Sequence, residues 1–240
     1  MNIRAISDVV SDLGEGPIWS PQTQCVTWTD ITQNIFHTAD FNTGATRSFP
    51  SPSMVGAIAH TREGDYVAAT QEGFARVDID GKFSPLQTYS KVIDNVTLSN
   101  GMGWSPDAKY FYYIDSIPGV LKRFDYESVD GCLSNPIDLI TFETSLGIPD
   151  GMSVTTDGKI VVALWDGRRL EVYEPSGKKI SEIKLGVSRP TSCTFGGEDG
   201  NVLIVTTASQ GIDLATEPLA GKILAVTGTG LSGLPPHRYG

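Results

Sequence analysis

Three oxygen-bearing side chains occupy the same position of a pattern that recurs along the chain. Glu15, Asn100 and Asp150 each directly precede a short apolar segment that begins with glycine and leads through a polar turn into a second apolar run. Two carboxylates and an amide carbonyl, completed by water, suit a divalent cation such as Ca²⁺, Mg²⁺ or Mn²⁺, and less distinctively Zn²⁺ or Fe²⁺. Without a cation, two clustered carboxylates would repel each other, and one would be driven toward protonation. The pattern therefore makes these residues candidate metal ligands.

A purely structural explanation stands beside this one. Asn-Gly and Asp-Gly are common turn dipeptides, because these residues tolerate positive φ, so Asn100 and Asp150 alone indicate no chemistry. Glu15 has no special role in turns and favours the metal interpretation. Val55 and Thr191 stand at the same position of the two other repeats. We expect them to form an apolar and a hydroxyl wall beside the ligands.

Other catalytic chemistry has little support in the sequence. It contains no GxSxG, HExxH or Walker pattern. The three histidines lie away from any candidate nucleophile, and we expect partly exposed structural side chains: His37, His60 and His237. The three cysteines lack metal-ligand spacing, which predicts reduced structural thiols: Cys25, Cys132 and Cys193.

The elements that position the candidate ligands come from an internal repeat. Five segments share one pattern of apolar strand, polar turn and second strand, and they start 40, 45, 50 and 41 residues apart, at Gly16, Gly56, Gly101, Gly151 and Ser192. A further strand follows each, as in "VLKRFDY" and "RLEVYEP". Four-stranded modules of this period predict an all-β fold, a β-propeller of five blades whose first strands line the central channel.

The whole chain, residues 1–240, reads as a single propeller domain without a linker. We expect the N-terminal run "NIRAISDVV" to pair into the last blade and close the ring. The four tryptophans lie inside the repeats, and we expect them in the core or the channel: Trp19, Trp28, Trp104 and Trp165.

The composition of the chain restricts which classes of partner it can bind. The formal net charge is -10 and no Lys/Arg cluster is present, which argues against nucleic acid. No segment is apolar enough for a secretory signal or a membrane span, so we expect no membrane partner and a cytoplasmic location. The sequence does not indicate an oligomeric state.

Several motifs together resemble the senescence marker protein 30, gluconolactonase and luciferin-regenerating enzyme family, also called regucalcin-like. They are "LGEGPIW", "SNGMGWSPDAKYFYYIDS", "FDYESVDG", "IPDGMSVTTDGKIVVALWDGRRLEVYEPSGK" and "RPTSCTFGGEDGNVLIVTTAS". The resemblance implies a propeller with one divalent cation in its channel, held by Glu15, Asn100 and Asp150. It also implies a sugar lactone as substrate and Ca²⁺ as the expected ion.

The chain departs from this family in one respect. Members usually have six blades, and between the second and third repeats they carry a blade with an Arg-Phe-Asn-Asp-Gly motif that supplies substrate contacts. Here "GFARVDIDGKFSPLQTYSKVIDNVTLSNG" runs straight to Asn100, so about one blade is lacking. Five evenly closed blades would stand roughly 72° apart instead of roughly 60°, around a narrower channel.

Three functional hypotheses follow. The first is a metal-dependent lactonase in which the cation acts as a Lewis acid and Asp150 as the general base. The second is a metal-binding propeller scaffold that lost catalysis with its substrate-binding blade. The third is a deletion product or an engineered chain.

Overall fold

Alternating side chains and turn residues organise the chain into short antiparallel strands. In β3 (Cys25–Asp30) and β4 (Ile35–Asp40), for example, buried Val26 pairs with Ala39 and buried Trp28 with His37. The computed structural model describes residues 1–86 and 91–239, and there the one helical element is a 3₁₀ turn, η1 (Thr144–Leu146). No helix in these ranges has the length and apolar character needed to cross a membrane.

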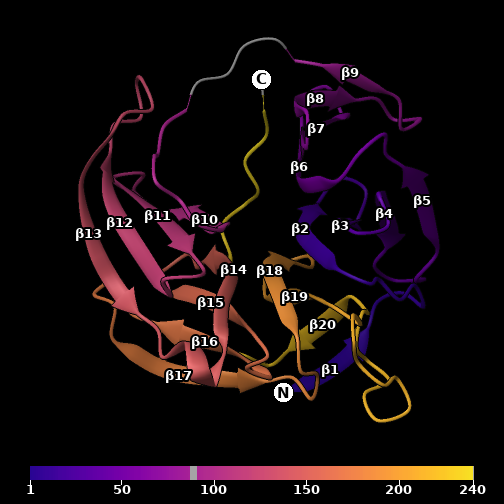
Figure 1. Ribbon diagram of the computed structural model, residues 1–240. Coiled ribbons are helices and arrows are strands. Elements are labelled where there is room, and N and C mark those ends of the chain that lie inside the picture. Colours follow the sequence, from indigo (N-terminus) through magenta and orange to yellow (C-terminus); the bar gives the residue numbers. More distant parts are fainter. Residues whose placement is uncertain (87–90, 240) are drawn as a thin grey trace.

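The strands form five four-stranded sheets, which we number as blades along the chain (Figure 1). Blade 1 contains β2 (Gly14–Ser20), β3, β4 and β5 (Thr46–Pro50). Blade 2 contains β6 (Val55–His60), β7 (Tyr66–Thr70), β8 (Gly73–Val77) and β9 (Phe83–Pro85). Blade 3 contains β10 (Ser99–Trp104), β11 (Tyr110–Asp115), β12 (Val120–Tyr126) and β13 (Leu133–Thr141).

The remaining blades complete the predicted five. Blade 4 contains β14 (Ile148–Val154), β15 (Ile160–Trp165), β16 (Arg169–Tyr173) and β17 (Lys179–Lys184). Blade 5 contains β18 (Pro190–Gly196), β19 (Val202–Thr207), β20 (Leu224–Thr227) and β1 (Asn2–Ala5). The repeat starts lie on the innermost strands β2, β6, β10, β14 and β18 (Figure 1). The five-bladed propeller is therefore confirmed.

The N-terminal strand closes the last blade, as predicted. β1 pairs antiparallel with β20, and Asn2 stands opposite Thr227. The C-terminal segment makes two further bridges on other blades: Gly233 pairs with Thr155, and Tyr239 pairs with Thr61. The N-terminal strand therefore completes blade 5, and the C-terminal segment connects to blades 4 and 2.

Apolar clusters hold neighbouring blades together at four interfaces. Blade 1 packs on blade 2 through a cluster that includes Phe36 and Ile58. Similar clusters join blade 3 to blade 4, blade 4 to blade 5, and blade 5 to blade 1. Burial of this apolar surface stabilises the ring by about 25 cal/mol per Å² removed from water.

The interface between blades 2 and 3 differs from the other four. The inner strands pack in the order β10, β14, β18, β2, β6, and no comparable packing joins β6 to β10 in the described residues. The aromatic cluster of Phe111, Tyr113 and Phe124 on blade 3 is covered by Ile93 and Val96 instead of by blade 2. The expectation of five evenly closed blades is therefore wrong, because the position of the lacking blade stays open.

Two further sequence expectations need correction. Trp19 and Trp28 lie in the core, but Trp104 is 37% exposed beside this open interface. His37 is buried and not partly exposed, since it stacks on Trp28 and shares a 2.8 Å hydrogen bond with Ser48.

Candidate metal centre

The three candidate ligands reach the channel from three different blades. Glu15 lies on β2, Asn100 on β10 and Asp150 on β14. In each of these strands the pairing register shifts at or directly after the candidate residue, and β6 and β18 show a similar shift at Val55 and Thr191. Such β-bulges redirect side chains and are frequent beside functional sites. The repeated bulge explains why one repeat position gives inward-pointing side chains.

The structure brings the three side chains together. The carboxyl group of Glu15 and the side-chain amide of Asn100 both lie close enough to the Asp150 carboxyl group to shift its pKa. Asp150 is buried, at 6% exposure, and Glu15 and Asn100 are half-buried. The Oδ1 atom of Asp150 is buried without a hydrogen-bond partner in the described part of the chain. An unsatisfied buried carboxylate oxygen is costly, so this atom is one that a ligand would satisfy.

The electrostatics of the pair match the expectation from the sequence. Loss of hydration raises the pKa of Glu15 to about 7, although a hydrogen bond from the Gly16 amide opposes this. The pKa of Asp150 is raised well above its usual value, first by burial and then by the neighbouring charge of Glu15, while Asn100 lowers it. Two carboxyl groups this close therefore resist ionising together unless a positive charge accompanies them.

Glycine at two of the repeat starts lets neighbouring inner strands approach each other closely. A Cβ at Gly101 would lie 2.7 Å from the carbonyl oxygen of Asp150, and one at Gly151 would lie 2.1 Å from Oγ of Ser192. These contacts are too short for any side chain. Glycine is therefore needed next to Asn100 and Asp150 by packing, not only by turn chemistry.

Two buried aspartates that the sequence interpretation missed hold the segments before Glu15 and Asn100. The Asp30 carboxylate accepts hydrogen bonds from the amides of Asp12 and Leu13, at 2.9 and 3.1 Å. In the same way Asp115 accepts from residues 97 and 98, at 2.9 and 2.8 Å. Both aspartates end the second strand of their repeats, so the signal was visible as the final Asp of "CVTWTD" and "YFYYID".

The two remaining residues at the repeat position serve packing. Val55 is 1% exposed and lies in the apolar cluster between blades 1 and 2. The Thr191 hydroxyl is fully buried and donates to the carbonyl of Gly14, which ties blade 5 to blade 1. The expected wall beside the ligands is therefore apolar at Val55. The Thr191 hydroxyl is not available to a ligand, because it already donates a hydrogen bond to the backbone.

The donor set fits a divalent cation of the hard, oxygen-preferring kind. It consists of two carboxylates and one amide oxygen, and residues 1–86 and 91–239 contain no cluster of three or more His, Cys, Asp and Glu side chains. Oxygen-only sets of this kind suit Ca²⁺ and Mg²⁺ better than thiolate- or imidazole-rich sites would. A cation here would also offset the repulsion between Glu15 and Asp150.

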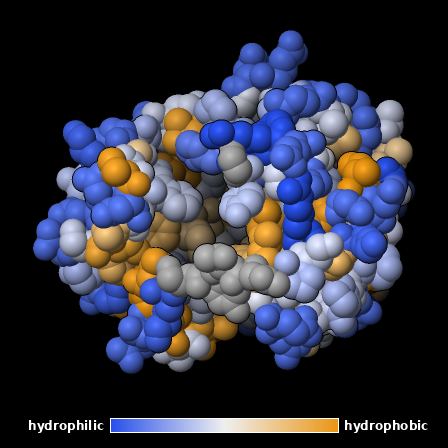
Figure 2. Space-filling model, turned by 90° about the horizontal axis from the view of Figure 1, so that it is seen from above, coloured by the Kyte–Doolittle hydropathy of each residue, from blue (hydrophilic) through white to orange (hydrophobic). Residues whose placement is uncertain are grey.

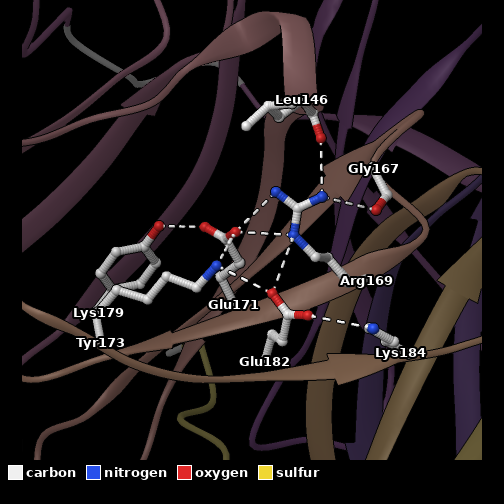
Figure 3. Close-up of polar contacts among 8 residues, drawn as sticks. All are labelled: Leu146, Gly167, Arg169, Glu171, Tyr173, Lys179, Glu182 and Lys184. Atoms are coloured by element: carbon white, nitrogen blue, oxygen red, sulfur yellow. Dashed lines mark hydrogen bonds and ion pairs between the residues drawn. The ribbon is translucent and has the colours of Figure 1, made fainter.

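A second polar cluster lies on the outer strands of blade 4, away from the predicted ligands. Figure 3 shows it: Arg169, Glu171, Tyr173, Lys179, Glu182 and Lys184. Buried Glu171 accepts from Arg169, Tyr173 and Lys179, and a depression of about 620 Å³ borders the cluster. Because each charged side chain is paired within the cluster, we interpret these ion pairs as structural contacts that connect β16 with β17.

Comparison with known proteins agrees with the repeat and with the lacking blade. The family model described as "SMP-30/Gluconolactonase/LRE-like region" matches residues 13–91 and 82–209. The two matched stretches meet at residues 82–91, just upstream of Asn100.

Relatives of known sequence and structure are similar to this chain over nearly its whole length. Regucalcin from Danio rerio is 33% identical over 280 aligned positions, which cover 95% of each chain. Regucalcin from Gallus gallus is 32% identical over 282 aligned positions, which cover 95% of this chain and 94% of the relative. Both alignments are longer than this chain of 240 residues, so each relative carries residues without a counterpart here. The structure of regucalcin from Agrobacterium tumefaciens, described as a calcium-binding protein, shares the fold at a TM-score of 0.89 and 19% identity, over 98% of this chain and 96% of that one.

Proposed function

This chain belongs to the SMP-30/gluconolactonase/LRE-like family, and we propose that it is a lactone hydrolase whose Glu15, Asn100 and Asp150 hold one divalent cation. Ca²⁺ is the ion we expect. Sugar lactones, the substrates that the family name suggests, are the first to test.

One observation carries this proposal: the paired carboxyl groups of Glu15 and Asp150 with the unsatisfied buried Oδ1 of Asp150. A structural aspartate would satisfy its oxygens with backbone amides, as Asp30 and Asp115 do. Asp150 instead holds one oxygen free beside a second carboxyl group. Perturbed carboxyl pairs of this kind are characteristic of catalytic and ligand sites.

The cation and the three side chains would have different roles in the reaction. A bound divalent cation would polarise the lactone carbonyl and lower the pKa of an adjacent water. Asp150 would take a proton from the attacking water, as general base. The water oxygen forms a bond to the carbonyl carbon, the ring C–O bond breaks, and the departing oxygen is protonated to give a hydroxy acid. Glu15 and Asn100 contact Asp150 and orient its carboxyl group.

Proton release from glucono- or xylono-lactone tests the proposal. We expect hydrolysis with Ca²⁺ that is lost in chelator, and loss of at least 10²-fold in kcat for Asp150→Asn, since general bases contribute roughly 10²–10⁴-fold. Asp157→Asn is the matched control, because Asp157 lies on the same blade and its carboxylate faces solvent beside Lys159. Hydrolysis that persists in chelator, or in Asp150→Asn, would contradict the proposal.

A metal-binding propeller without catalysis is the second candidate. It is favoured by the open interface between blades 2 and 3, where family members usually carry the blade that contacts substrate. It predicts that Ca²⁺ raises the melting temperature while no lactone is hydrolysed.

A further inference from the structure

In the residues that the structure describes, no strand packing joins the inner strands β6 of blade 2 and β10 of blade 3 next to the candidate metal centre. At the other repeat starts, a Cβ on the glycine would meet the next blade: Gly16 approaches Gly56 within 3.6 Å, and Gly101 approaches Asp150 within 2.7 Å. A Cβ on Gly56 would meet nothing within 4 Å, and the backbone of Gly56 does not adopt positive φ. The surface that an adjacent blade would cover is therefore open at Gly56.

The exposed side chains that line this opening are apolar. On β6 the exposed residues are Gly56, Ala57 and Ala59, and on β10 Met102 is 50% and Trp104 37% exposed. Met102 and Trp104 stand opposite Tyr113 and Phe111, which places them on the face of blade 3 away from blade 4. Viewed from this side, the molecule shows a hollow between the two blades (Figure 2). Exposed apolar surface beside a site usually marks a place where an apolar group binds.

The opening is continuous with the candidate ligands. Met102 follows Asn100 by two residues on β10, so the two residues lie at most about 7 Å apart along the strand. On the opposite wall Gly56 directly follows Val55, which stands at the ligand level of its repeat. A group attached to a lactone at the metal centre would therefore extend into the opening within a few bonds.

We propose that this opening receives an apolar substituent, so that the preferred substrates are lactones that carry an alkyl or aryl chain. The inference rests on the proposed lactonase function and names its substrate class. The exposed inner-strand residues of the opening beyond the ligand position, Gly56, Ala57, Ala59, Met102 and Trp104, carry no charge and no hydroxyl, so the hydroxyl groups of a bulky polyol would gain no partners from them. A second copy of this chain fits less well as the occupant, because two chains of net charge -10 repel each other.

A series of γ-lactones with side chains from methyl to octyl tests the inference. We expect kcat/KM to rise by about fourfold for each added methylene over the first few, the factor that corresponds to burying a CH₂ group. Gly56→Leu should flatten this dependence by filling the opening, and Met102→Gln should weaken it. Ala45→Leu, an exposed turn position on blade 1, is the control that keeps the wild-type dependence.

Binding of the matching alkyl lactams, measured by calorimetry, separates the two claims. Metal-dependent hydrolysis with no dependence on chain length, in rate or in lactam binding, overturns the substituent pocket and leaves the lactonase intact. Hydrolysis of glucono-lactone but of no alkyl lactone in the series also overturns the substituent pocket and leaves the lactonase intact. Hydrolysis of neither overturns the lactonase, and the substrate assignment falls with it. A dimer in size-exclusion chromatography that Gly56→Leu converts to monomer, with no lactam binding, assigns the opening to a second copy and also overturns the inference.

Discussion

Raising the pH in the absence of a cation should destabilise this protein, because Glu15 must then ionise beside Asp150. The folded state raises the pKa of Glu15 from 4.5 to about 7. A carboxyl group of this kind contributes stability that is fully present below pH 4.5 and is lost as the pH rises through 7. The raised pKa of Asp150 acts in the same direction.

The expected magnitude follows from the two pKa values. One pKa unit corresponds to about 1.4 kcal/mol, so the rise for Glu15 corresponds to about 3 kcal/mol of unfolding free energy lost between pH 4.5 and 8. In a chain of this size that loss lowers the melting temperature by about 10 °C. Glu15→Gln removes this ionisation, so in chelator at pH 8 the variant should be more stable than the wild type. With Ca²⁺ the order should reverse, since the variant lacks a ligand.

Urea unfolding at pH 5 and pH 8, in chelator and in Ca²⁺, measures these four states. Glu198→Gln is the matched control, because Glu198 is exposed on the turn between β18 and β19 and should follow the wild type throughout. A wild type that keeps its pH 5 stability at pH 8 in chelator would refute the reasoning. So would a Glu15→Gln variant that is no more stable than the wild type under those conditions.

Three other substitutions or treatments have defined outcomes. Asp115→Ala frees two backbone amides ahead of Asn100, so Ca²⁺ affinity in titration calorimetry should fall roughly tenfold, whereas an unchanged affinity would show that the segment is held by other contacts. Gly151→Ala should lower the unfolding free energy by more than about 2 kcal/mol, because its Cβ would collide with Ser192. Gly56→Ala should change the unfolding free energy by less than about 0.5 kcal/mol, because nothing lies near its Cβ. Equal losses in the two variants would contradict this difference in packing. The Cys193 thiol, buried and with its pKa raised to about 12, should react with a thiol reagent only after unfolding, and prompt labelling at pH 8 would disprove its burial.

The repeat made the fold readable from the sequence. Glycine starts, polar turns and β-branched second strands located the inner strands, and the shared repeat position brought Glu15, Asn100 and Asp150 to one place, as the contacts among them show. Their role as metal ligands stays a prediction. The convergence was predictable because equivalent positions in a propeller come to similar depths around one axis.

Other features depended on interactions that no local pattern encodes. The open side beside Gly56 results from the absence of a neighbouring blade, and local propensity says nothing about which neighbour a strand will meet. Trp104 illustrates the same limit, since its apolar character predicts burial and the lacking blade leaves it exposed. Asp30 and Asp115 were visible as repeated residues, but their function depends on backbone amides 17 or 18 positions away.

The pairing of β1 with β20 has a consequence for how the chain is made. Residues 2–5 leave the ribosome long before their partners, residues 224–227, are synthesised. Blades 1 to 4 are each built from consecutive strands and can form during translation, while the first strand waits unpaired. Completion of blade 5 is therefore a late, non-local step, and a chain that stops before residue 224 would expose both the edge of β19 and the free N-terminal strand to aggregation.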